Sequence, residues 1–339
     1  MKKIFCLLVT AALFAAVVVS CGDKPVLVTE VKLNKTSLEL SVSDFDFLIA
    51  TVLPDDADDK AVSWASSDED VATVTDGKVT AIAEGEATIT VTTVDGNHKA
   101  NCKVTVFPLH QGETEMAFVE GGTFMMGATD EEIASEEAYE WEGPAHQVKL
   151  SSFKIAKTPV TQGQWKSLMP TNPSVNKGDN LPVENITRAE VLEYIKKLNE
   201  ATGKDYRLPT EAEWEFAARG GKESKGYKYS GSNNVDEVAW YSVNSNSKTQ
   251  LMSKKLPNEL GIYDMSGNVS EFCKDWYGPY ANAEQVDPQG PSIGSGYVIR
   301  GGSYASIASA CRATYRASWA PTPGSERAGF IGFRLVHSY

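Results

Sequence analysis

The chain has 339 residues, of which 42% are hydrophobic and 23% are charged, so it is long enough for two domains with at least one sizeable core. This composition excludes a disordered or fibrous chain. The formal net charge of −13 argues against a nucleic-acid partner, because a phosphate backbone would be repelled.

Residues 1–20 have the pattern of an export signal. Met1-Lys2-Lys3 is basic, residues 4–19 carry no charge, and small residues precede Cys21. The pattern resembles a bacterial lipoprotein signal, which implies acylation of Cys21 and a lipid-anchored place in the cell envelope. We expect the outer membrane, with exposure on the cell surface. A retained membrane helix is the weaker alternative, because the apolar run is short and no basic cluster follows it.

Loss of residues 1–20 would remove Lys2 and Lys3 from the 32 basic residues and none of the 45 acidic ones, which changes the net charge from −13 to −15. The cysteines that remain after Cys21 are Cys102, Cys273 and Cys311. An exported compartment permits disulfides, and a bridge between Cys273 and Cys311 stays open at this stage.

Residues 21–25 are a short polar tether, and residues 26–107 read as short strands with period-two alternation. Turn signals such as Asp76-Gly77 separate the strands, which predicts an all-β antiparallel sandwich. The run VSWASS at 62–67, with the short strands after it, resembles the bacterial immunoglobulin-like group-two domain. That family implies a spacer or adhesion module. We interpret Trp64 as a core residue of the sandwich rather than a ligand platform.

Residues 108–112 form a linker, and residues 113–339 form the second domain. We interpret the acidic segment 131–142 as a solvated loop. His146 has no second metal-binding side chain near it in sequence, so we interpret it as structural. Residues 222–254 are rich in Ser, Asn and Gly and should be mostly irregular.

Three helices are predicted from capping boxes, in which a hydroxyl and a side chain three residues later satisfy the first free backbone donors. The pairs are Thr161 with Gln164, Thr187 with Glu190, and Thr210 with Glu213. The helices should end at Met169, Gly203 and Gly220. The second should bury Val191, Leu192, Ile195 and Leu198, and the third Trp214 and Phe216.

Four motifs that follow one another in this domain carry a second resemblance. They are RLPTEAEWEFAARG at 207–220, GIYDMSGNVSEF at 261–272, RGGSY at 300–304 and GFRL at 332–335. Together they resemble the formylglycine-generating enzyme (sulfatase-modifying factor) family over residues 113–336. The resemblance implies an α+β, C-type-lectin-like domain with much irregular structure.

A calcium site is predicted within the second of these motifs. Asp264 and Glu271 offer carboxylates, and Gly267 and Val269 offer backbone carbonyls, within eight positions. Hard oxygen ligands on a glycine-containing turn suit calcium. The resemblance implies the same four ligands, because these positions match a calcium site of the family. In the alternative interpretation, Asp264 and Glu271 only cap turns.

The position of the family's active site is altered in this chain. Enzymes of the family oxidise a substrate cysteine with oxygen and use two cysteines that bind copper; those positions match Ser306 and Cys311. A hydroxyl is a poor ligand for soft Cu(I), so copper is not expected. Ile307, Ala308 and Ala310 stand where the family's enzymes carry histidine, arginine and tyrosine. Cys311 is the one catalytic candidate if the chain is an active oxidase.

Small and hydroxylated residues on an intact framework resemble the retroelement-diversified variable proteins with a C-type-lectin fold. The resemblance implies a recognition surface for an unknown protein or glycan, and aromatic residues supply its anchors. The predicted surface consists of Tyr304, Ser306, Ile307, Ala308, Ala310, Tyr315 and Trp319. Alanine-rich patches also occur in ordinary degenerate members of the family, so diversification and drift both stay open for this loop. Two alternatives for the function remain: an active formylglycine-generating oxidase that acts on a sulfatase cysteine, and a structural lipoprotein of an outer-membrane secretion or gliding machine.

Overall fold

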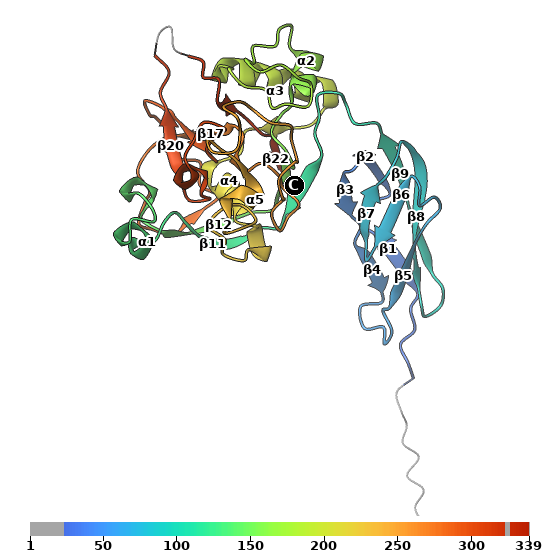
Figure 1. Ribbon diagram of the computed structural model, residues 1–339. Helices are drawn as coiled ribbons and strands as arrows, with labels where there is room; N and C mark the ends of the chain where they lie inside the picture. Colours follow the sequence, from blue (N-terminus) through green and yellow to red (C-terminus); the bar gives the residue numbers. More distant parts are fainter. Residues whose placement is uncertain (1–23, 323–325, 339) are drawn as a thin grey trace, which may run out of the picture. The chain divides into compact units, whose positions relative to one another are not determined.

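The computed structural model describes residues 24–322 and 326–338, and the chain divides into two compact units (Figure 1). The first unit runs to Leu40 and continues over Phe45–Val106. The second comprises Ser41–Asp44 and Phe107–Tyr339. The predicted signal and the predicted acylation site, Cys21, lie outside the described residues. No helix within 24–322 or 326–338 is long and apolar enough to cross a membrane.

The first unit consists of strands that mostly pair antiparallel and confirms the predicted immunoglobulin-like fold. One sheet has the order β2 (Ser37–Ser41), β9 (Lys99–Phe107), β8 (Gly85–Thr93) and β5 (Val62–Ser66). A second has the order β3 (Phe45–Phe47), β7 (Lys78–Ala81) and β6 (Ala72–Thr75), and β1 (Glu30–Leu33) pairs with β4 (Ala50–Leu53).

Alternation decides which side chains of this unit are buried. On β8, Ala87, Ile89 and Val91 are buried and their neighbours are less so, as a two-residue period requires. Trp64 packs against the small cluster around Val91, as the prediction that it is a core residue requires. Its side chain is only half-buried, however, so it lies at the edge of that core.

The second unit holds several short sheets linked by irregular segments. The first has the order β10 (Met116–Val119), β13 (Phe153–Ala156), β22 (Val336–Ser338) and β14 (Tyr206–Arg207). Another has the order β20 (Arg316–Trp319), β19 (Tyr297–Arg300), β17 (Ser270–Trp276) and β21 (Ile331–Gly332). A third has β11 (Gly122–Met126), β12 (His146–Leu150) and β18 (Gln285–Val286), while β15 (Ala239–Trp240) pairs with β16 (Ser266–Gly267).

The three helices predicted from capping boxes are confirmed. They are α2 (Gln162–Leu168), α3 (Arg188–Thr202) and α4 (Glu211–Ala218), and in each the predicted threonine caps the helix and the third residue reaches back. The short helices are α1 (Asp130–Ala134), α5 (Val235–Val238), and the 3-10 turns η1 (Glu140–Glu142), η2 (Gly221–Glu223) and η3 (Ala308–Cys311).

One prediction about α3 is wrong. Leu192 is half exposed, and Tyr194 takes its place on the buried face with Val191, Ile195 and Leu198. A helix turns 100° per residue, so residues 191, 194, 195 and 198 share one face and residue 192 lies off it. Gly203 ends the helix in the left-handed region, at φ 69°, as predicted.

Helix α4 is buried on every side and contacts β11, β12, β17 and β19. Trp214 and Phe216 lie in the core, as predicted. Its three acids, Glu211, Glu213 and Glu215, are buried as well. Buried carboxylates require partners, because desolvation of a lone charge is costly. The partners of α4 therefore define the centre of the domain.

Candidate functional site

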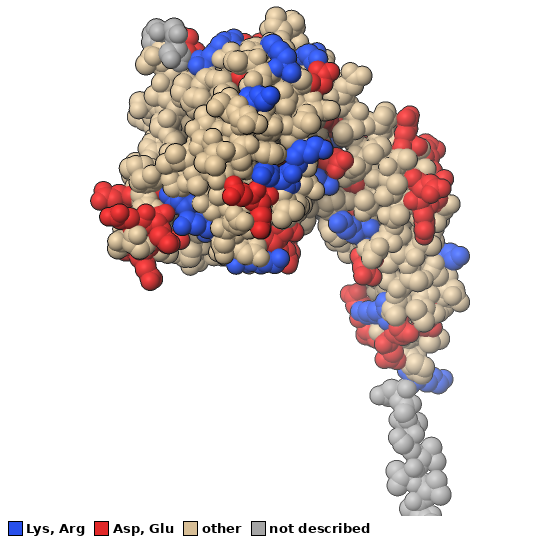
Figure 2. Space-filling model, in the orientation of Figure 1, with Lys and Arg blue, Asp and Glu red and all other residues tan. Residues whose placement is uncertain are grey.

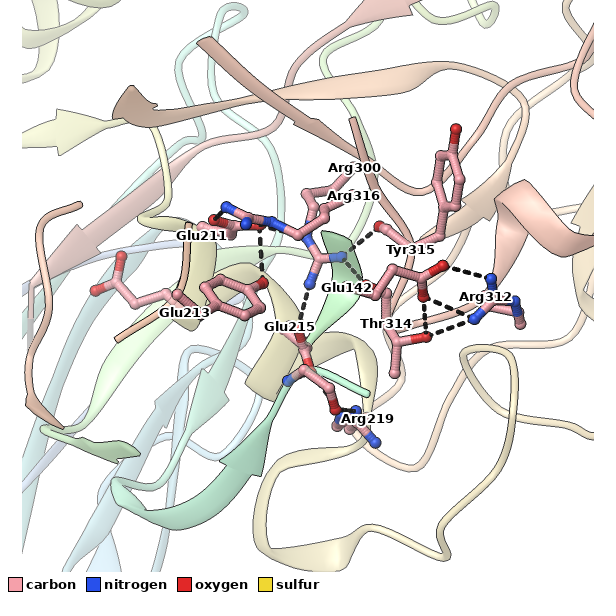
Figure 3. Close-up of polar contacts among 12 residues, drawn as sticks. Glu142, Glu211, Glu213, Glu215, Arg219, Arg300, Arg312, Thr314, Tyr315 and Arg316 are labelled. Atoms are coloured by element: carbon pink, nitrogen blue, oxygen red, sulfur yellow. Dashed lines mark hydrogen bonds and ion pairs between the residues drawn. The ribbon is translucent and has the colours of Figure 1, made fainter. Parts of the chain in front are cut away.

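Arginines neutralise the buried acids of α4 (Figure 3). Arg207 binds Glu213 through both carboxylate oxygens, at 2.7 Å each. Arg316 on β20 binds Glu211 through both carboxylate oxygens, at 2.7 Å from Nε to Oε1 and 2.6 Å from Nη2 to Oε2. Arg300 at the end of β19 donates to Glu215, and Arg219 donates to the same carboxylate at 2.9 Å. Two-pronged arginine pairs fix both partners in orientation as well as in charge.

A further pair ties the acidic segment to the same framework. Arg312 donates to Glu142 at 2.7 Å and 2.6 Å, and Thr314 donates its hydroxyl to Glu142 at 2.7 Å (Figure 3). Glu142 is fully buried. The interpretation of 131–142 as a solvated loop is therefore wrong at its last residue, because Glu142 is the counter-charge of Arg312. We call Arg300, Arg312 and Arg316 with Glu142, Glu211 and Glu215 the arginine framework.

Ser306 and Cys311, at the two positions that match the family's copper ligands, have different surroundings. The Ser306 hydroxyl accepts from the Ser303 backbone N–H at 2.9 Å and lies 3.1 Å from the Ser303 hydroxyl. Cys311 is fully buried and packs with Tyr229 and Tyr241. Burial raises the pKa of the Cys311 thiol to about 12, so the thiol stays protonated near neutral pH.

These residues do not fit a copper ion. A soft ion needs two thiolates, and this position offers one buried thiol and one hydroxyl already bonded to Ser303. The described residues contain no group of three His, Cys, Asp or Glu side chains placed to hold a metal. Cys102, Cys273 and Cys311 are free thiols in the structure, so the bridge between Cys273 and Cys311 is not formed.

The predicted recognition residues divide into three groups. Tyr304, Ser306, Ile307 and Ala308 follow β19, and the Ile307 side chain is 62% exposed. Ala310 is buried, so it cannot present a surface, and this part of the prediction is wrong. The 3-10 turn η3 rotates it inward beside Cys311. Trp319 on β20 contacts Phe330 edge to face, at 5.9 Å between ring centroids.

Tyr315 has aromatic neighbours that sequence reasoning missed. Its ring lies 6.0 Å from that of Tyr139, and Tyr139 stacks on Trp141 at 4.4 Å with the planes 5° apart. Tyr139 and Trp141 come from the acidic segment and are exposed. The signal for them was two large aromatics inside a run of acids, which a purely solvated loop does not need. We call Tyr139, Trp141 and Tyr315 the aromatic platform.

Acidic side chains surround this platform. Figure 2 shows them gathered at the edge where Figure 1 places α1. The exposed acids of the segment are Asp130, Glu131, Glu136, Glu137 and Glu140. An acidic rim repels phosphate and other anions, so the platform is not suited to a nucleic acid.

The two carboxylates of the predicted calcium turn, Asp264 and Glu271, have different hydrogen-bond partners. Asp264 is buried, and its carboxylate accepts from Ser253 N–H at 2.8 Å. Desolvation raises the Asp264 pKa, and a cation would relieve that cost. Glu271, in contrast, accepts from Arg334 at 2.6 Å and 2.7 Å and from Trp214 at 2.7 Å. Asp264 therefore fits a cation, whereas Glu271 already has a cationic partner.

His146 has the structural surroundings that were predicted. Its ring is buried, its Nδ1 lies 3.1 Å from the Pro144 carbonyl, and it packs against Tyr280 at 4.8 Å between ring centroids. Because a carbonyl oxygen can only accept, Nδ1 carries the hydrogen of that bond.

A capped, buried α4 whose acids pair with Arg300 and Arg316, set among short sheets and long irregular segments, is the architecture of a formylglycine-generating-enzyme-like domain that follows an immunoglobulin-like one. The family model "Sulfatase-modifying factor enzyme 1-like domain" matches residues 104–339, and "Bacterial Ig-like domain (group 2)" matches residues 27–104. The chain therefore belongs to the sulfatase-modifying factor enzyme 1-like family and carries a bacterial Ig-like domain before it. Both resemblances seen in the sequence are confirmed.

Similar proteins differ in what their names describe. Chaperone protein LppX of Paenibacillus barcinonensis is 36% identical over 213 residues, which is 48% of this chain and 72% of that protein. Formylglycine-generating enzyme of Streptomyces coelicolor is 32% identical over 195 residues, covering 52% of this chain and 59% of the enzyme. The solved Treponema denticola variable protein 1 has a TM-score of 0.59 and 30% identity, covering 66% of this chain and 95% of that one.

Proposed function

We propose that this protein is a lipid-anchored binding protein of the bacterial cell envelope, in which the family's oxidase chemistry has been replaced by recognition of a protein or glycan. The observation that carries the proposal is the chemistry at the former copper position. Ser306 supplies a hydroxyl, Cys311 is a buried thiol whose pKa is raised to about 12, and neither is suited to bind Cu(I).

The rest of the domain supports a recognition role. The arginine framework is complete and buried, so it holds residues 304–319 in a defined shape. Exposed aromatics are typical anchors of binding surfaces, and Trp141 has that character, while Tyr315 is half-buried and meets the edge of Tyr139. The likeness to a protein named as variable is compatible with exchangeable surface residues on a fixed scaffold.

An oxidase assay tests the proposal directly. Purified protein is incubated with Cu(I), oxygen and a sulfatase-motif peptide, and formylglycine is measured by mass spectrometry. We expect no conversion by the wild type and none by Cys311→Ala. Conversion by the wild type that is lost in Cys311→Ala would overturn the proposal and establish the oxidase alternative.

The anchor is tested separately, because it rests on residues 1–21. We expect Cys21→Ala to move the protein from the membrane fraction to the soluble fraction and to abolish labelling by a fatty-acid analogue. A variant that stays in the membrane fraction without label would show that another segment supplies the attachment.

A further inference from the structure

A cavity of about 500 Å³ lies beside the N-terminus of α4, away from the Ser306 and Cys311 position. None of its lining residues comes from 304–311. Its volume is in the range of small-molecule sites. The titratable and aromatic residues of its wall are His146, Glu211, Asp275, Tyr280 and Arg316, and the amides of Gln285 and Gln289 line it as well.

Two of the charges in this wall cancel each other. Arg316 binds both oxygens of Glu211, and its remaining terminal nitrogen donates to the Gly278 carbonyl at 2.8 Å. Its guanidinium also lies over the Tyr280 ring, at 3.9 Å from the centroid. Tyr280 donates its hydroxyl to Glu211 at 3.0 Å. Arg316 is therefore fully engaged and is not left to attract an anion.

Asp275 is the charge without a counter-charge. It is 5% exposed, and no Lys, Arg or His of the described chain forms an ion pair with it. One oxygen accepts from the Glu211 backbone N–H at 2.9 Å, in the first turn of α4. A helix N-terminus stabilises a carboxylate only partly. Burial raises the pKa of Asp275 to about 7, with repulsion from Glu211 as the next cause.

The aromatic walls show what kind of cation would fit. Tyr280 and His146 pack against each other and line the same cavity as Asp275. Since His146 uses Nδ1 as a donor to Pro144, the neutral ring has Nε2 as an acceptor with no protein partner in the described ranges. A carboxylate and a ring nitrogen accept hydrogen bonds from an ammonium group, and an aromatic face accommodates an apolar body.

We propose that this cavity binds a small organic cation whose ammonium group pairs with Asp275 and whose apolar part lies against Tyr280. The site is independent of the surface proposed for protein or glycan recognition. The ligand class follows from the missing ion pair. Arg188 is bound to backbone carbonyls and Arg207 to Glu213, so neither pairs directly with Asp275, and a bound ammonium would supply that direct partner.

Benzylamine and benzyl alcohol form a matched pair of probes, because they share the ring and differ in the charged group. Binding to the full chain is measured by calorimetry or by ligand-detected NMR at pH 8. We expect a Kd for benzylamine at least tenfold lower than that for benzyl alcohol. Equal affinities, or no binding of benzylamine, would overturn the proposal without any variant.

Asp275→Asn assigns the charged partner. The amide keeps the size of the side chain and an oxygen that can accept from Glu211, and circular dichroism verifies the fold. We expect the Kd values of benzylamine and benzyl alcohol for this variant to differ by no more than twofold. Asp205→Asn, an exposed acid of the same domain, should leave the preference unchanged. A preference that survives in Asp275→Asn would assign binding elsewhere.

The pH dependence supplies a second readout. Asp275 must be ionised to pair with an ammonium, and its pKa of about 7 means that it loses its proton between pH 6 and pH 8. Benzylamine should therefore bind more tightly at pH 8 than at pH 6. The charged or titratable groups that face Asp275 are Glu211 and Glu213 on α4, Arg316 on β20, His146 on β12, Arg188 on α3 and Arg207 on β14. The response must disappear in Asp275→Asn, which excludes these groups as its source.

Discussion

The arginine framework and the loop 304–310 that lies between its arginines differ in almost every physical respect. The framework consists of charges that are buried and paired: Arg300 with Glu215, Arg312 with Glu142, and Arg316 with Glu211. The loop, with the sequence YASIASA, contains no charged side chain and exposes Ile307. The arginine framework fixes the backbone. The loop 304–310 has no charged side chain whose replacement would leave a buried partner unpaired.

This difference would let the residues of the loop change while the fold is kept. A charge left buried without its partner is strongly unfavourable, so removal of one member of a framework pair should be costly. An exposed aliphatic side chain contributes little to folding, so Ile307 can be exchanged at small cost. The loop is then a place where function can diverge while the scaffold stays constant.

The largest effect should come from a break in the framework. We expect Glu142→Ala to lower the free energy of unfolding by about 3 to 5 kcal/mol, because Arg312 would remain buried without its counter-charge. Urea unfolding followed by tryptophan fluorescence measures the change.

Two controls make the comparison sharp. Glu140→Ala removes an exposed acid two positions away and should change the free energy of unfolding by no more than about 0.5 kcal/mol, as should Ile307→Ala in the loop. If Glu142→Ala costs no more than Glu140→Ala, the buried pair does not hold the acidic segment in place.

The same contrast separates what the sequence could predict from what it could not. Capping boxes are local in sequence, so Thr161, Thr187 and Thr210 predicted the N-terminus of each of three helices correctly. The Glu142 to Arg312 pair joins positions 170 apart, and no periodicity reports on such a contact. Asp275 was missed for the same reason. It has no ion pair because Arg316, which lines the same cavity, binds Glu211, and that contact joins residues far apart in the sequence. Ala310 was misplaced because the 3-10 turn that buries it has no strong local signal.

Calcium at the 264–271 turn should give a smaller effect than the framework. A ligand present at 100 times its Kd stabilises the folded state by about 2.7 kcal/mol. We expect chelation with EGTA to lower the Tm of the wild type and to leave Asp264→Asn unchanged. Glu271 is left intact in this design, because its loss would strand Arg334 and Trp214. Equal responses of the two proteins to EGTA would refute calcium at Asp264.

The smallest effect on folding, and the most informative one on function, should come from the aromatic platform. Trp141 is 48% exposed and stacks on Tyr139, which meets the edge of Tyr315, so its removal exposes little that was buried. We expect Trp141→Ala and Tyr315→Ala to leave the Tm almost unchanged. On a glycan array or in a cell-binding assay in which the wild type gives a signal, each variant should weaken the free energy of binding by about 1 to 3 kcal/mol, since aromatic anchors concentrate interface energy.

Leu192→Ala is the matched control, because it removes a half-exposed apolar side chain from α3, where no platform residue lies. Loss of binding in Ile307→Ala but not in the two aromatic variants would move the recognition surface from the platform to the loop 304–310, and would mean that the acidic segment serves only to supply Glu142 to Arg312.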